Sequence, residues 1–160
     1  TKELNESFTA KEQEEQAMVE AFIEEKLELA GIPNYQKSEK QEAKFGKIKH
    51  LKTAYTAPAT DKQALELLQI LQPTSAVCGL PREESFGFIQ EFETLNRSFY
   101  SGITGVLKKD AATFFVNLRC MRFFEKSVEL FAGAGITQES DPEQEWIETE
   151  NKIAAIKSLL

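Results

Sequence analysis

The sequence predicts an α+β protein in which an antiparallel sheet is flanked by helices. Apolar residues recur at helical spacing near both ends of the chain, and a helix-capping signal precedes each of these runs. Between them, from residue 98, the spacing of apolar residues changes to a period of two, which is typical of strands. Helices at the ends and strands in the later middle part together indicate this fold class.

The first helix is predicted over residues 10–30. Thr9 and Glu12 have the spacing of a capping box, in which the hydroxyl accepts from a backbone N–H and the carboxylate reaches back. Gly31 and Pro33 supply the stop signal. The apolar residues that form its inward stripe are Val19, Phe22, Ile23, Leu27 and Ala30.

The middle of the chain is more polar. Residues 34–42 are predicted to be a loop and residues 44–56 one strand, because apolar and polar residues alternate in the second stretch. A short helix follows, which we expect to be capped by Asp61 and ended by Pro73. Pro81 is expected to open another helix, since proline favours the first position.

An antiparallel meander is predicted next, with strands at 99–107, 113–121 and 126–133. Alternation along the middle strand puts Asn117 and Arg119 on the same face. The chain then closes with a helix that runs to the C-terminus, opened by a capping box over 140–143. Its apolar stripe is Trp146, Ile153, Ile156 and Leu160.

The composition is that of an ordinary folded protein. At 160 residues the chain is long enough for one domain with its own core. A net charge of −7 argues against nucleic acid and against an acidic membrane as partners. Cys78 and Cys120 form no CxxC pair, and neither a membrane-length apolar run nor a signal peptide is present. A cytoplasmic protein is the expectation.

Three carboxylates are candidate metal ligands. Glu15 falls on the inward stripe of the first helix, where a carboxylate needs a partner. Glu145, Glu148 and Lys152 share one face of the last helix. With His50 as the single histidine, these oxygen donors suit Mg²⁺ better than zinc. The alternative is a solvated helix face with ordinary ion pairs.

Other candidates are weaker. Arg119 in an apolar strand needs an anion, either a structural carboxylate or that of a ligand. His50 is either a structural histidine or a general base. Gly133 and Gly135 resemble a dinucleotide loop, but Gln138 stands where the third glycine should be, so this motif fails. The glycines can still let backbone N–H groups approach an anion.

Taken in order, several stretches resemble the C-terminal part of isochorismate synthases, within the chorismate-utilising enzymes. They are residues 72–81, 100–102, 130–136 and 140–152, with weaker matches at 11–15 and 49–51. The resemblance implies a two-sheet α/β sandwich with flanking helices and a Mg²⁺ cofactor. It also implies that residues 1–160 are the C-terminal part of a chorismate-binding domain.

The resemblance assigns roles residue by residue. It implies that Glu15 and Glu145 are Mg²⁺ ligands, with Glu148 close by. It further implies that Lys152 and His50 lie near the ring carboxylate and the reacting edge of chorismate. The residues implied to grip the pyruvyl carboxylate are Tyr100, Arg119 and the backbone of Gly133.

The resemblance also implies the reaction. Ala76 lies in a Pro-Thr-Ser-Ala-Val sequence similar to the isochorismate synthase form, whereas the ammonia-using relatives usually carry threonine there. Water is therefore the expected nucleophile and isochorismate the expected product, for menaquinone or siderophore biosynthesis. The family's lysine base and glutamic acid are expected upstream of Thr1, so the chain alone is expected to be inactive. Gln16 and Gln72 stand where the family usually has histidine, and an amide cannot carry a proton at neutral pH.

Two other interpretations stay open. The chain could be a binding or regulatory domain that keeps the fold without the chemistry, or part of a salicylate synthase, which shares nearly every site residue. Since half of a two-sheet fold would leave apolar strand surface uncovered, self-association is also expected.

Overall fold

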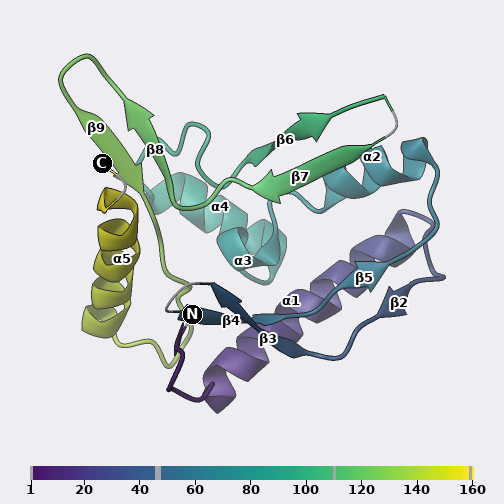
Figure 1. Ribbon diagram of the computed structural model, residues 1–160, viewed down its shortest axis with the longest axis horizontal. Helices are drawn as coiled ribbons and strands as arrows, with labels where there is room; N and C mark the ends of the chain where they lie inside the picture. The colour runs from purple at the N-terminus through teal and green to yellow at the C-terminus, as the bar shows by residue number, and fades with distance from the viewer. Residues whose placement is uncertain (1, 46–47, 110, 159) are drawn as a thin grey trace. The chain divides into compact units, whose positions relative to one another are not determined.

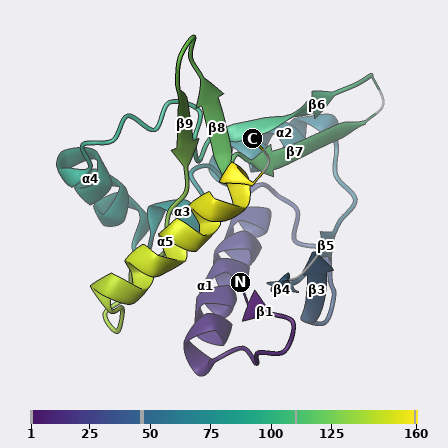
Figure 2. The ribbon, with the colours of Figure 1, turned by 60° about the vertical axis from the view of Figure 1, so that its left-hand side comes forward.

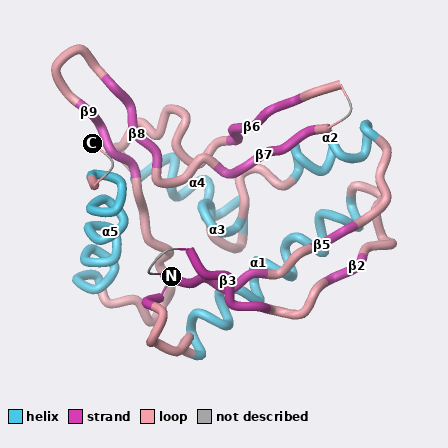
Figure 3. The backbone as a smooth tube through the Cα atoms, viewed as in Figure 1, coloured by secondary structure: helices cyan, strands magenta, loops and turns pink. Residues whose placement is uncertain are grey.

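A computed structural model describes residues 2–45, 48–109, 111–158 and 160, and it confirms the α+β class (Figure 1). The chain divides into two compact units, Thr1–Ser75 and Ala76–Leu160. Each unit combines helices with short antiparallel strands joined by loops (Figure 3).

The first unit is organised by α1 (Ala10–Leu29), which confirms the predicted first helix. Both halves of its capping box form: the Glu12 N–H donates to Thr9 Oγ1 at 3.3 Å, and the Thr9 N–H donates to Glu12 Oε2 at 2.9 Å. After the helix, Gly31 takes a φ of 69°, the left-handed conformation in which glycine carries no Cβ penalty. The predicted end of the helix is therefore also correct.

The strands of this unit differ from the prediction. A sheet of order β1-β4-β3 contains β1 (Lys2–Glu3), β3 (Gln41–Phe45) and β4 (Ile48–Lys52), while β2 (Gln36–Lys37) pairs with β5 (Tyr55–Thr56). The predicted loop over 34–42 and the single strand over 44–56 are thus wrong. The alternation of apolar and polar residues does not reveal where a hairpin turns. Residues paired across its two strands point to the same face, so the apolar residues of both strands can lie on one side.

The core of this unit lies at the end of α1. Leu27, Ala30 and Ile32 are buried there, and α2 (Asp61–Ile70) packs against them through Leu67 and Ile70. The cap of α2 is Thr60 rather than the predicted Asp61, because the Thr60 hydroxyl accepts from the Gln63 N–H. Asp61 instead lies in the first turn, where the helix dipole favours negative charge.

The second unit contains two hairpins and helices. It begins within α3 (Ser75–Cys78), of which only Ser75 belongs to the first unit. Its other elements are α4 (Arg82–Phe92), β6 (Ile103–Leu107), β7 (Ala112–Val116), β8 (Cys120–Phe123), β9 (Val128–Phe131) and α5 (Pro142–Lys157). β6 pairs only with β7 and β8 only with β9 among the described residues.

The predicted meander is therefore wrong, because the middle strand breaks at residues 117–119. Arg119 takes a φ of 50°, in the left-handed region that turns the chain between β7 and β8. Asn117 bonds back to the preceding turn, its N–H donating to the Gly102 carbonyl at 2.8 Å. Asn117 and Arg119 thus belong to a turn and not to one face of a continuous strand.

The last helix is confirmed with a change at each end, since it also stops at Lys157 rather than running to the C-terminus. Asp141, not Ser140, caps α5, since Asp141 Oδ1 accepts from the Gln144 N–H at 2.9 Å. α5 contacts β9, and the two lie side by side in both ribbon views (Figures 1 and 2). Ile156 is buried as its stripe predicts, whereas Trp146 is 65% exposed.

Candidate functional site

The predicted site residues fall in both units. The first unit carries Glu15 on α1 and His50 on β4. The second unit carries Ala76 on α3, Tyr100 and Arg119 in turns, Gly133 after β9, and Glu145, Glu148 and Lys152 on α5.

Tyr100 and Gly133 are in direct contact. A Cβ built on Gly133 would lie 2.7 Å from the Tyr100 phenol oxygen, so the absence of a side chain at 133 makes room for the phenol. The Tyr100 ring stacks on Phe131, with centroids 5.7 Å apart and an interplanar angle of 23°. Burial raises the pKa of Tyr100. The phenol is therefore a neutral O–H donor at physiological pH.

Lys152 joins the last helix to the same glycine. Its ammonium donates to the Gly133 carbonyl at 2.8 Å and pairs with Glu148 at 2.7 Å, one turn earlier on α5. The structure thus brings together four of the predicted residues: Tyr100, Gly133, Lys152 and Glu148. The Glu148–Lys152 pair also confirms that an i,i+4 ion pair forms on this helix face, as the alternative interpretation expected.

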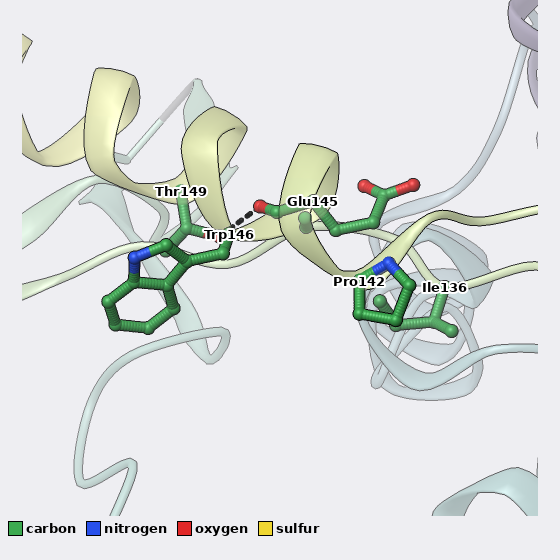
Figure 4. A pocket seen from close by; sticks show the side chains of 6 residues that line it. Ile136, Pro142, Glu145, Trp146 and Thr149 are labelled. Carbon is green, nitrogen blue, oxygen red and sulfur yellow. Dashed lines mark hydrogen bonds between the residues drawn. The ribbon is translucent and has the colours of Figure 1, made fainter.

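Glu145 lies beside this group on α5, in a different setting. Its carboxylate accepts from the Ser140 hydroxyl at 2.7 Å, and Ser140 Oγ accepts from the Thr137 N–H at 3.0 Å. Figure 4 shows the Glu145 carboxylate directed away from the Trp146 indole, at the edge of a shallow pocket. That pocket is lined by Ala134, Ile136, Pro142, Glu145, Trp146 and Thr149.

The turns that carry Tyr100 and Arg119 are joined by Asn117. The Asn117 side-chain amide donates to the Phe99 carbonyl at 2.9 Å, and its backbone carbonyl accepts from the Ser101 N–H at 2.9 Å. Both predicted carboxylate-binding side chains are therefore held on one hydrogen-bonded pair of turns. Asn117 contributes as a turn residue, a role that the strand prediction did not give it.

Three further charged residues, Glu20, Glu93 and Arg97, were missed. Arg97 forms a bidentate ion pair with Glu93, and its guanidinium lies over the Tyr100 ring at 5.8 Å. The i,i+4 spacing of Glu93 and Arg97 was a usable signal.

In the first unit the buried acid is Glu20, which is 7% exposed, whereas Glu15 is half-buried.

Glu20 belongs to a polar network in the first unit. It pairs with Lys37 at 2.9 Å and accepts from the Thr53 hydroxyl at 2.6 Å. Burial alone would raise the pKa of Glu20, but these hydrogen bonds and the charges of Lys40 and Lys37 lower it to about 2. The network holds α1 against the strands of its own unit.

The candidate metal ligands are chemically consistent with a hard cation. Glu15, Glu145 and Glu148 offer only carboxylate oxygens, the donors that Mg²⁺ prefers. Within the described residues no group of three or more His, Cys, Asp or Glu side chains is gathered as a metal site. By residue type, these three carboxylates are therefore suitable ligands for Mg²⁺.

Comparison with known proteins gives the family. The chain belongs to the chorismate-binding enzymes, whose family model matches residues 2–160. It is 39% identical over 120 residues to isochorismate synthase MenF of Escherichia coli, a match covering 75% of this chain and 28% of that protein. It is 36% identical to the vibriobactin-specific isochorismate synthase of Vibrio cholerae, over 67% of this chain and 28% of that protein.

Solved structures agree with the fold. The structure of the menaquinone-specific isochorismate synthase MenF from Escherichia coli matches with a TM-score of 0.84 and 35% identity. The match covers 92% of this chain and 34% of that one. The chain thus spans well under half the length of the relatives it matches. Among the described residues, no helix is long and apolar enough to cross a membrane.

Proposed function

We propose that this chain is the part of an isochorismate synthase that holds the carboxylates of chorismate. The whole enzyme would add water at C2 of chorismate and lose the C4 hydroxyl as water, so that the net reaction is an isomerisation to isochorismate. The observation that carries the proposal is the contact of Tyr100 and Lys152 with Gly133. Family membership and 39% identity to an isochorismate synthase support it.

The chain's own residues would bind and orient the substrate. The neutral Tyr100 O–H and the Arg119 guanidinium would donate to the pyruvyl carboxylate, helped by the Gly133 N–H. Lys152 would face the ring carboxylate, and His50 the reacting edge. Ala76 stands where the ammonia-using relatives usually carry threonine, so water would be the nucleophile. We assign no general base or acid to these residues.

A hard cation completes the proposal. Glu15 and Glu145 would hold Mg²⁺, with Glu148 close by. When bound, Mg²⁺ would neutralise the ring carboxylate and make loss of the C4 hydroxyl easier. The product would serve menaquinone or siderophore biosynthesis.

We also propose that residues 1–160 form the C-terminal part of a chorismate-binding domain, because the chain spans only 28% of the related E. coli synthase. The chain alone would then bind chorismate without converting it.

Self-association of the chain is also proposed. Val106, Leu107 and Phe115 are each more than half exposed on the β6–β7 hairpin, and this apolar surface supports it. Size-exclusion chromatography at tens of micromolar would reveal it, and a clean monomer would contradict it.

Calorimetry with chorismate, with and without Mg²⁺, tests the binding proposal. We expect Tyr100→Phe to weaken chorismate binding and Glu145→Ala to weaken Mg²⁺ binding, each by about tenfold. Glu150→Ala, which changes an exposed acid on the same helix, should alter neither isotherm. Unchanged isotherms for Tyr100→Phe and Glu145→Ala would overturn these assignments.

Product analysis separates the alternatives. Turnover of chorismate at the rate of a full synthase would show that no further base or acid is needed. Release of pyruvate with salicylate would favour a salicylate synthase. Chorismate binding with no reaction, even when the chain is combined with the remainder of a related synthase, would favour a regulatory domain.

A further inference from the structure

Arg97 makes contacts that the proposed substrate binding does not use. Its guanidinium forms two bonds to the Glu93 carboxylate, at 2.5 and 2.6 Å, and its side chain is 27% exposed. The hydrogen bond from Arg97 lowers the pKa of the Glu93 carboxyl by more than burial raises it, so the net shift is downward and the pair is ionised at neutral pH. Glu93 follows α4 directly and fixes the direction in which the guanidinium points.

The remaining donors of Arg97 reach two other segments. Nη1 donates to the Val77 carbonyl at 3.2 Å and to Ser101 Oγ at 3.3 Å. Val77 follows Ala76 in α3, and Ser101 follows Tyr100 in its turn. The Arg97 carbonyl also accepts from the Tyr100 N–H at 2.8 Å. One side chain thus joins the segments that carry Ala76 and Tyr100.

We propose that Arg97, held by Glu93, is a positioning residue that fixes the Tyr100 phenol relative to the α3 segment. The guanidinium lies 5.8 Å from the centre of the Tyr100 ring, within the range of a cation–π contact. The ring also stacks on Phe131. The importance of this for chorismate rests on the proposed function, but the position of Tyr100 can be measured by itself.

The geometry requires arginine and not merely a positive charge. A planar guanidinium can bind Glu93 with two donors while a third reaches Val77 and Ser101, whereas a lysine ammonium is a point charge on a flexible stem. Arg97→Lys should therefore loosen Tyr100 although it keeps the charge. Arg97→Gln should loosen it further.

Nuclear magnetic resonance of the chain labelled with ¹³C at tyrosine Cζ tests the proposal. The chain has only three tyrosines, and Tyr100→Phe assigns the Tyr100 signal. We expect Arg97→Gln, Arg97→Lys and Glu93→Gln to shift or broaden this signal. In Arg97→Gln the pKa of Tyr100 should rise further, because the Arg97 charge lowers it. Glu91→Gln, an exposed change on α4, is the control.

Chorismate binding by the same variants separates this inference from the proposed function. Weakening by about fivefold or more in Arg97→Gln, together with a displaced Tyr100 signal, supports both. An unchanged Tyr100 signal and titration in Arg97→Gln would overturn the positioning role, even if Tyr100→Phe abolishes binding. A displaced signal with no effect of Tyr100→Phe on binding would overturn the proposed function alone. If Arg97→Gln fails to fold, Arg97→Lys and Glu93→Gln decide by the same measurements.

Discussion

The phenol oxygen of Tyr100 lies where a side chain on residue 133 would have to be, 2.7 Å from the Cβ that Gly133 lacks. The ring cannot yield easily, because it stacks on Phe131. The Gly133 carbonyl in turn accepts from Lys152. A single glycine therefore sets the spacing between the turn that carries Tyr100 and the helix that carries Lys152.

Gly133→Ala should displace Tyr100. The added methyl group must push the ring off Phe131 or move the backbone that binds Lys152, and we expect a stability loss of about 1–3 kcal/mol. Gly135→Ala is the matched control, because a Cβ there meets nothing within 4 Å. Thermal denaturation and the tyrosine Cζ signal measure both effects. Equal behaviour of the two variants would contradict the contact.

Gly105→Ala should disrupt the β6–β7 hairpin. Gly105 pairs with Phe114, and a Cβ on it would lie 2.9 Å from the Phe114 Cα and still closer to the Thr113 carbonyl oxygen. Since both obstacles are backbone, we expect a loss of about 2–3 kcal/mol in urea denaturation. Gly87→Ala, in open space on α4, should instead gain up to about 1 kcal/mol. If Gly105→Ala leaves the free energy of unfolding unchanged, Gly105 does not pair closely with Phe114.

Glu20→Gln should destabilise the chain by about 2 kcal/mol in urea denaturation. The amide keeps the shape of the carboxylate, but it removes the charge that pairs with Lys37 at 2.9 Å, so that Lys37 keeps only its ion pair with Glu24, and it weakens the bond from Thr53. Glu14→Gln, at an exposed position of the same helix, should cost little. A similar small loss for both variants would show that the network adds no stability.

Acid should weaken the protein through Glu20 in a defined window. The pKa of Glu20 is lowered from 4.5 to about 2 in the folded chain, so its contribution is present above pH 4.5 and lost as the pH falls toward 2. Urea midpoints measured from pH 6 down to pH 2 should fall more steeply in the wild type than in Glu20→Gln. Parallel curves would contradict the pKa shift.

Lys152→Met should separate stability from binding. The ion pair with Glu148 is partly exposed, with side-chain exposures of 19% and 49%, so its loss should cost at most about 1 kcal/mol. Loss of the hydrogen bond to the Gly133 carbonyl should add about 1 kcal/mol. If Lys152 faces the ring carboxylate, chorismate binding should weaken by about tenfold or more. Calorimetry beside thermal denaturation compares the two effects, and Lys157→Met, an exposed change at the end of the same helix, is the control. Binding that falls no further in Lys152→Met than in the control would leave Lys152 a structural role only.

Prediction from the sequence succeeded where structure depends on neighbouring residues. The capping box of Thr9 and Glu12 and the stop at Gly31 lie within one or two turns of the helix ends that they set, so they are readable from the chain. The prediction failed at Arg119, because a residue in the left-handed region interrupts a strand without changing the alternation of apolar residues. The hairpin of β3 and β4 was missed for a related reason, since pairing across a turn keeps apolar residues on one face.

By itself, then, the sequence determined the α+β class, the ends of the first helix, the presence of the last helix, and the likeness to isochorismate synthases. Only the tertiary structure decided that Tyr100, Lys152 and Glu148 meet at or around Gly133, that Arg97 reaches both Val77 and Ser101, and that Glu20 is more deeply buried than Glu15. Helix ends follow from hydrogen bonds between close neighbours. Burial and contact across the fold depend instead on how separate elements pack, which residue spacing along the chain does not encode.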